Sequence, residues 1–118
     1  MRKNRIILAI DDDADMLEYY QAALAGLGQV RTAGGLKDAR PQLQGVDLII
    51  LDFHLQDDQE TFQKIVPELR KSAPVLLCSG VQDERVPILG DALGTIGYWN
   101  KADGLQKLHA LVHAALKT

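Results

Sequence analysis

Continuous apolar runs recur along the chain and are separated by segments with helical periodicity. The three strongest runs, which show no alternation of apolar and polar positions, are RIILAI (5–10), LIIL (48–51) and VLLC (75–78). Such runs are typical of parallel strands that are buried on both faces of a sheet. Two weaker runs are predicted to be strands as well, namely QVRTA (29–33) and GYWN (97–100).

The segments between and after these runs place apolar residues three to four positions apart, which predicts five helices. The first four predicted helices lie within residues 15–28, 35–45, 61–72 and 83–94. Alternating strands and helices predict a doubly wound α/β fold, with a five-stranded parallel sheet and helices on both of its faces. A chain of 118 residues has the size of one domain, so we expect a single domain over residues 1–118.

Side chains that can cap helices mark the predicted start of the first helix. Asp15, with Glu18 as its reciprocal partner, is predicted to be the cap, and Gly26 and Gly28 are predicted to end the helix. Asp13 is expected to be a solvated residue at the start of this helix.

Asp103 is predicted to cap the last helix, whose apolar stripe should face inward and comprises Leu105, Leu108, Val112 and Leu116. Prolines interrupt three of the other helical segments. Pro41 lies in a short, poor helix, Pro67 should kink or divide its helix, and Pro87 is tolerable only near a helix start.

Composition limits the class of protein. The chain is 47% hydrophobic and 25% charged, and its net charge of −3 argues against direct nucleic-acid binding. A single cysteine, Cys78, forms no internal disulfide and is expected to be a buried thiol in a reducing compartment. The basic start, MRKNR, is followed by too few apolar residues for a signal peptide or a membrane span, so we expect a cytoplasmic protein.

Polar residues follow the predicted strands at their carboxyl ends. Asp11 and Asp12 follow the first strand, Asp52 the third, Ser79 the fourth and Lys101 the fifth. In doubly wound folds these ends meet at one edge of the sheet, where ligands bind. Three crowded carboxylates should raise one another's pKa unless a cation shares the site, and Mg²⁺ prefers such oxygen ligands. A carboxylate beside Mg²⁺ can act as nucleophile toward a phosphoryl group.

The set IDDD, LIILD, LLCSG and YWNK resembles the receiver domain of bacterial two-component response regulators over the whole chain. The resemblance implies the flavodoxin-like strand order 2-1-3-4-5. It makes Asp52 the phosphoacceptor of a phosphorelay. It also implies a Mg²⁺ site formed by Asp12, Asp52 and the backbone carbonyl of His54. Asp11 would belong to the same site and act largely through water.

The same resemblance assigns Ser79 and Lys101 to the phosphoryl oxygens and Tyr98 to the position of a switch aromatic. Phosphorylation would then reshape the surface of helix 4, strand 5 and helix 5. The implied partners are a sensor histidine kinase or a histidine phosphotransfer protein, an output domain or downstream protein, and a second copy in a phosphorylation-dependent homodimer. The chain would be stand-alone or part of a longer regulator, and it would catalyse only its own phosphorylation and dephosphorylation.

Two departures from the family's pattern concern loops. Gln56 stands where the family usually has proline, four residues after the acceptor. Ala102 follows Lys101 where the family usually has a cis proline. A cis bond to alanine would cost about 2.5–4 kcal/mol, so we predict a trans bond and a rerouted loop.

Several polar or aromatic residues are given plain structural roles. Asp57 and Asp58 are predicted to be turn residues. His109 and His113 are spaced four apart and are expected to lie on a partly exposed helix face, since no third metal ligand is evident. Trp99 is expected to lie in the core.

Two other functions remain open at this point. Haloacid-dehalogenase-like phosphatases also begin with a strand and Asp-x-Asp, which Asp11 and Asp13 match, with Ser79 and Lys101 as later residues. That hypothesis leaves Asp52 without a role. A receiver-like interaction module that signals without phosphorylation is the third possibility.

Overall fold

The strands of the computed structural model, which describes residues 4–55, 59–80 and 84–117, form one parallel sheet in the order β2-β1-β3-β4-β5. The strands are β1 Ile6–Ile10, β2 Gln29–Ala33, β3 Leu48–Asp52, β4 Val75–Ser79 and β5 Gly97–Asn100. The five predicted strands and the order 2-1-3-4-5 are therefore confirmed. Every residue of β3 and β4 is buried, which explains why these runs are continuously apolar.

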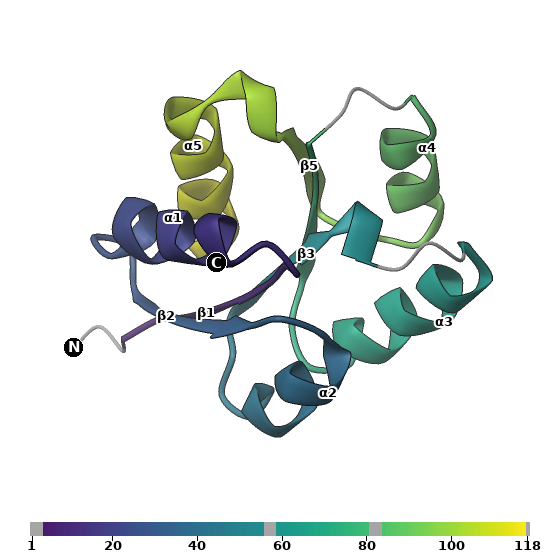
Figure 1. Ribbon diagram of the computed structural model, residues 1–118, viewed down its shortest axis with the longest axis horizontal. Coiled ribbons are helices and arrows are strands. Elements are labelled where there is room, and N and C mark those ends of the chain that lie inside the picture. Colours follow the sequence, from purple (N-terminus) through teal and green to yellow (C-terminus); the bar gives the residue numbers. More distant parts are fainter. Residues whose placement is uncertain (1–3, 56–58, 81–83, 118) are drawn as a thin grey trace.

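Helices cover both faces of the sheet, with α1 and α5 on one face and α2, α3 and α4 on the other (Figure 1). The helices are α1 Ala14–Leu24, α2 Leu36–Ala39, α3 Gln59–Arg70, α4 Arg85–Ala92 and α5 Leu105–Leu116. Three 3₁₀ turns accompany them: η1 Arg40–Gln42, η2 Phe53–Leu55 and η3 Lys101–Asp103. The turns η2 and η3 directly follow β3 and β5, so they lie at the edge of the sheet formed by the carboxyl ends of the strands, where folds of this class bind ligands.

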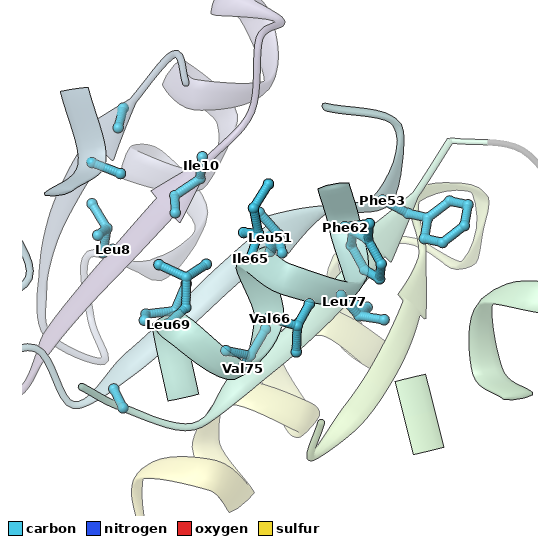
Figure 2. Packing of buried hydrophobic residues seen from close by; sticks show 14 of the residues in the cluster. Leu8, Ile10, Leu51, Phe53, Phe62, Ile65, Val66, Leu69, Val75 and Leu77 are labelled. Carbon is cyan, nitrogen blue, oxygen red and sulfur yellow. The ribbon is translucent and has the colours of Figure 1, made fainter. Parts of the chain in front are cut away.

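The sheet separates two hydrophobic clusters. Figure 2 shows the cluster under α3, in which Phe62, Ile65, Val66 and Leu69 pack on residues of β1, β3 and β4. The cluster on the opposite face contains Tyr20, Trp99, Leu108 and the buried thiol of Cys78. The predicted core position of Trp99 is confirmed, because Trp99 is only 1% exposed.

The helix caps differ from the predictions. Asp13, not Asp15, caps α1: its side chain accepts a hydrogen bond of 3.0 Å from the backbone N–H of Asp15. The helix begins two residues earlier than a cap at Asp15 would place it, so Asp15 falls inside the first turn. Helix α5 begins after Gly104, whose φ of +88° favours glycine, and Asp103 instead belongs to η3.

One further prediction about the helices was wrong, and of the two effects predicted for Pro67, a kink or a division of its helix, division does not occur. Leu105 was expected to face inward but is 44% exposed, because it is the first residue of α5 and precedes the part of the stripe that reaches the sheet. Helix α3 runs through Pro67 without being divided. Burial of its apolar face on both sides of the proline outweighs the lost backbone hydrogen bond. Pro41 and Pro87 lie at the beginning of η1 and in the first turn of α4, as the sequence predicts.

Among residues 4–55, 59–80 and 84–117, no helix has the length and apolar character that crossing a membrane requires.

Candidate functional site

Three carboxylates meet at the carboxyl ends of β1 and β3. These strands pair in parallel, with Ile10 opposite Leu51, so the residues that follow Ile10 lie beside Asp52 at the end of β3. One carboxylate oxygen from each of Asp11, Asp12 and Asp52 lies within 4.8 Å of the other two, close enough to hold one metal ion. Asp11 and Asp52 are buried and Asp12 is exposed, so a site built on these residues opens to solvent.

Lys101 brings a positive charge to the same edge of the sheet from η3, directly after β5. Its Nζ lies 2.8 Å from Asp11 Oδ2 and 3.8 Å from Asp52 Oδ1. The side chain of Lys101 is only 18% exposed, so both ion pairs are shielded from bulk water. The predicted convergence of the acids and the lysine at this edge is therefore observed.

Burial and charge shift the pKa values of two of these groups. Burial, followed by repulsion from Asp11, raises the pKa of the Asp52 carboxyl, although Lys101 and the His54 N–H oppose the shift. Burial alone would lower the pKa of the Lys101 ammonium. Its hydrogen bond to Asp11 and its attraction to Asp52 outweigh burial and raise that pKa. The site therefore keeps a cation beside Asp52, whose carboxyl is costly to ionise.

Backbone N–H groups orient the two buried carboxylates. The N–H of His54 donates to Asp52 Oδ1 at 3.2 Å, and the N–H of Asp13 donates to Asp11 Oδ1 at 2.9 Å. Each donor lies two residues after its acceptor, so the turn after each strand holds the carboxylate at the carboxyl end of that strand.

Ser79 is joined to the site by the imidazole of His54. Ser79 is the last residue of β4 and is fully buried. Its Oγ lies 3.1 Å from His54 Nε2. The His54 ring also meets the Phe53 ring edge to face, with centroids 5.2 Å apart. Sequence reasoning used only the backbone carbonyl of His54 and missed this contact. The sequence does contain a signal for this contact, because the imidazole of His54 lies two residues after Asp52, the carboxylate at the end of a predicted strand.

The segment after β5 has the trans peptide bond that was predicted before Ala102. The Lys101–Ala102 peptide bond is trans, and the Asn100 side chain accepts a hydrogen bond of 2.9 Å from the Ala102 N–H. This bond caps η3 and thereby sets the start of the turn that carries Lys101. Tyr98, in β5, is half-buried and packs against the cluster on the α3 side of the sheet.

Other predicted residues lie away from the carboxylates or outside the described chain. Asp13 serves as the cap of α1 and is not among the three clustered carboxylates. His109 and His113 are exposed on α5, as expected. The predictions for Gln56, Asp57 and Asp58 fall outside the described residues.

The donor set fits a hard divalent cation. Carboxylate oxygens from three residues, one of them solvent-exposed, match the ligands of Mg²⁺, which retains several waters. Lys101 can neutralise a further anion beside Asp52. The arrangement can therefore bind a metal ion and an anionic group next to a buried carboxylate.

No family model matches the chain, and neither does any curated protein. Solved structures match it closely in fold. A response regulator from Thermotoga maritima has a TM-score of 0.86 and 19% identity, with 98% of this chain and 100% of that chain covered.

Two further structures have 24% identity and cover 98% of this chain. The beryllofluoride-activated DrrB receiver domain has a TM-score of 0.83, with 100% of its chain covered. The signal receiver domain of an HD domain-containing protein from Pseudomonas fluorescens Pf-5 has a TM-score of 0.82, with 96% covered. The chain thus has the fold of response regulator receiver domains.

Proposed function

We propose that this chain is a phosphoacceptor module of a two-component phosphorelay, in which Asp52 receives the phosphoryl group. The observation that carries the proposal is the meeting of Asp11, Asp12, Asp52 and Lys101 at one edge of a receiver fold. The beryllofluoride-activated DrrB receiver domain, which shares this fold, supports it.

In the proposed reaction a carboxylate oxygen of Asp52 attacks the phosphorus of a phosphohistidine on a sensor kinase or histidine phosphotransfer protein. The new O–P bond forms as the P–N bond breaks, and the imidazole leaves with the electron pair and takes up a proton. Lys101 binds a phosphoryl oxygen, and Ser79 donates a hydrogen bond to another. Water later attacks the phosphorus of the acyl phosphate, releasing inorganic phosphate and restoring the carboxylate, so the chain acts only on its own phosphoryl group.

Asp11, Asp12 and Asp52, with the backbone carbonyl of His54, would hold Mg²⁺. The ion would supply positive charge to offset that of the phosphoryl oxygens and the carboxylates. Lys101 contributes a second positive charge that needs no metal. The raised pKa of Lys101 keeps the ammonium protonated throughout the neutral range.

The proposed readout is a change in the surface of α4, β5 and α5, in which Ser79 moves toward the phosphate and Tyr98 turns inward. Exposed apolar side chains support a partner surface here, since Ile88 of α4 is 71% exposed and Ile96, just before β5, is 47% exposed. An output domain, a downstream protein or a second copy would read this surface. We place the module, residues 1–118, in the cytoplasm, either alone or within a longer regulator.

The test is incubation with acetyl phosphate and Mg²⁺, followed by intact mass measurement and mapping of the modified peptide. The expected result is one phosphoryl group on Asp52, lost in Asp52→Asn and retained in Asp13→Asn, which preserves the cap. Modification of Asp11, with sustained phosphate-ester turnover by Asp52→Asn, would support the phosphatase instead. No response to acetyl phosphate or to beryllofluoride with Mg²⁺ would support a phosphorylation-independent interaction module.

A further inference from the structure

His54 contacts both the proposed acceptor and the nearby hydroxyl. Its backbone N–H donates to Asp52 Oδ1, and its Nε2 lies 3.1 Å from Ser79 Oγ. The two contacts connect the end of β3 with the end of β4 through a single residue of η2. The proposed phosphoryl group would be attached to Asp52 and would be bound by Ser79, and His54 contacts both of these residues.

The imidazole is held in place by the hydrophobic core. Its ring packs edge to face on Phe53, and the Phe53 ring packs in turn on Phe62, with centroids 5.0 Å apart. Phe53 is 6% exposed and Phe62 is 2% exposed, so this support is anchored between the sheet and α3. The His54 ring is therefore oriented by buried neighbours although the residue itself is exposed.

Counting protons restricts how this contact can serve a phosphorylated Asp52. A serine hydroxyl has one proton to donate, and phosphoryl oxygens at neutral pH mainly accept hydrogen bonds. If Ser79 gives its proton to a phosphoryl oxygen, its Oγ can only accept a hydrogen bond from His54. The contact then persists only if Nε2 carries a proton. If Ser79 instead donates to Nε2, the imidazole and the phosphoryl group compete for that one proton.

We propose that His54 is a positioning residue whose Nε2–H donates to Ser79 Oγ and thereby directs the Ser79 hydroxyl proton toward the phosphoryl group on Asp52. The inference rests on the proposed function and adds a role for the His54 imidazole in binding the phosphoryl group. His54 acts on the phosphoryl group through Ser79, while its backbone groups act on Asp52 and the metal. Substitution of the side chain separates these two roles, because the backbone groups remain.

The experiment measures the affinity for beryllofluoride at saturating Mg²⁺ in five proteins. These are the wild type, His54→Leu, His54→Gln, Ser79→Ala and the double variant with His54→Leu and Ser79→Ala. We expect His54→Leu to weaken binding about three- to tenfold, the range of one net hydrogen bond. His54→Leu should have little effect on beryllofluoride affinity when Ser79 is already alanine, because the two residues act as one unit. His54→Gln, whose amide can donate to Ser79, should recover part of the loss.

Two controls exclude a general structural effect. His109→Leu removes an exposed imidazole from α5 and should leave the beryllofluoride affinity unchanged. The Mg²⁺ affinity of each variant is measured without beryllofluoride, so that beryllofluoride binding is compared at Mg²⁺ concentrations that saturate each protein. Nitrogen NMR of the wild type should show Nε2 of His54 protonated, both before and after beryllofluoride binds.

The outcomes separate this inference from the proposed function. A wild type that fails to bind beryllofluoride with Mg²⁺ contradicts the proposed function, and the positioning role fails with it. A wild type that binds, combined with unchanged or tighter binding by His54→Leu, overturns the positioning role alone. Additive effects of His54→Leu and Ser79→Ala, or an unprotonated Nε2, overturn it as well.

Discussion

The ammonium of Lys101 is closer to Asp11 than to Asp52, at 2.8 Å against 3.8 Å. Asp11 is therefore the main partner of the lysine in this state, and Asp52 is the less neutralised of the two buried carboxylates. That difference agrees with the raised pKa of Asp52, for which burial and repulsion from Asp11 outweigh the attraction of Lys101. The carboxylate proposed to accept a phosphoryl group is thus the one with the weaker ion pair.

Removing the ammonium should destabilise the fold. Lys101→Met leaves two buried carboxylates without their cation, and we expect the free energy of unfolding to fall by about 3 kcal/mol in a chelating buffer. Saturating Mg²⁺ should restore part of the loss by supplying positive charge. Urea unfolding with and without Mg²⁺ measures both effects.

Lys107→Met is the matched control for that experiment, because Lys107 pairs with Asp103 at 3.9 Å with both side chains largely exposed. Its effect should stay below about 0.5 kcal/mol. Equal losses in the two variants would contradict the importance of the buried pair.

Mg²⁺ should stabilise the folded chain by mass action. At ten times the dissociation constant the gain is about 1.4 kcal/mol, which a thermal melt in millimolar Mg²⁺ can detect. Asp12→Ala should abolish most of the response by removing one of the three carboxylates. Asp13→Ala should respond like the wild type, since its carboxylate caps α1. A melting temperature that does not change with Mg²⁺ would argue against the metal site.

Replacing the proposed acceptor should stabilise the metal-free protein at neutral pH. Because the pKa of Asp52 is raised in the folded state, the ionised form is less favourable there than in the unfolded chain. Relative to Asp52→Asn, wild-type stability should fall as the pH rises through the folded pKa. Below the ordinary aspartate pKa the difference should vanish, because the carboxyl is then protonated in both states.

Urea unfolding across a pH series in a chelating buffer measures this difference. Asp38→Asn, at an exposed position on α2, is the control and should change stability little at any pH. If the stability advantage of Asp52→Asn over the wild type increased as the pH was lowered, the prediction would be contradicted.

The observed cap of α1 predicts different costs for two neighbouring acids. Asp13→Ala should lower the free energy of unfolding by about 1 kcal/mol, because the N–H of Asp15 loses its side-chain acceptor. Asp15→Ala should cost less, because Asp15 contributes only a charge near the helix start. Chemical denaturation of both variants tests this order, and the reverse order would restore Asp15 as the cap.

Cys78 should be inert to thiol reagents in the folded protein. The thiol is fully buried, and burial raises its pKa to about 12, so the reactive thiolate is scarce at mildly alkaline pH. Labelling should become rapid only when denaturant is added. Rapid labelling of the native protein would show that β4 opens readily.

The strands and the approximate positions of the helices followed from the sequence, because burial on both faces of a sheet leaves continuous apolar runs. The polar residues after those runs also placed the candidate site, since parallel topology brings strand ends together whatever the loops do. Asp11, Asp52 and Lys101 were therefore predicted to meet before any distance was known.

Only the tertiary structure decided which neighbour each side chain contacts. Asp13 rather than Asp15 caps α1, and the ring of His54 reaches Ser79 across 25 positions of the sequence. Leu105 lies on an apolar stripe yet is exposed, because its helix has not yet reached the sheet at that position. Periodicity specifies which face of an element is apolar. The exact start of a helix and the partner of a polar group depend on turn geometry and on packing between segments that are distant in the chain.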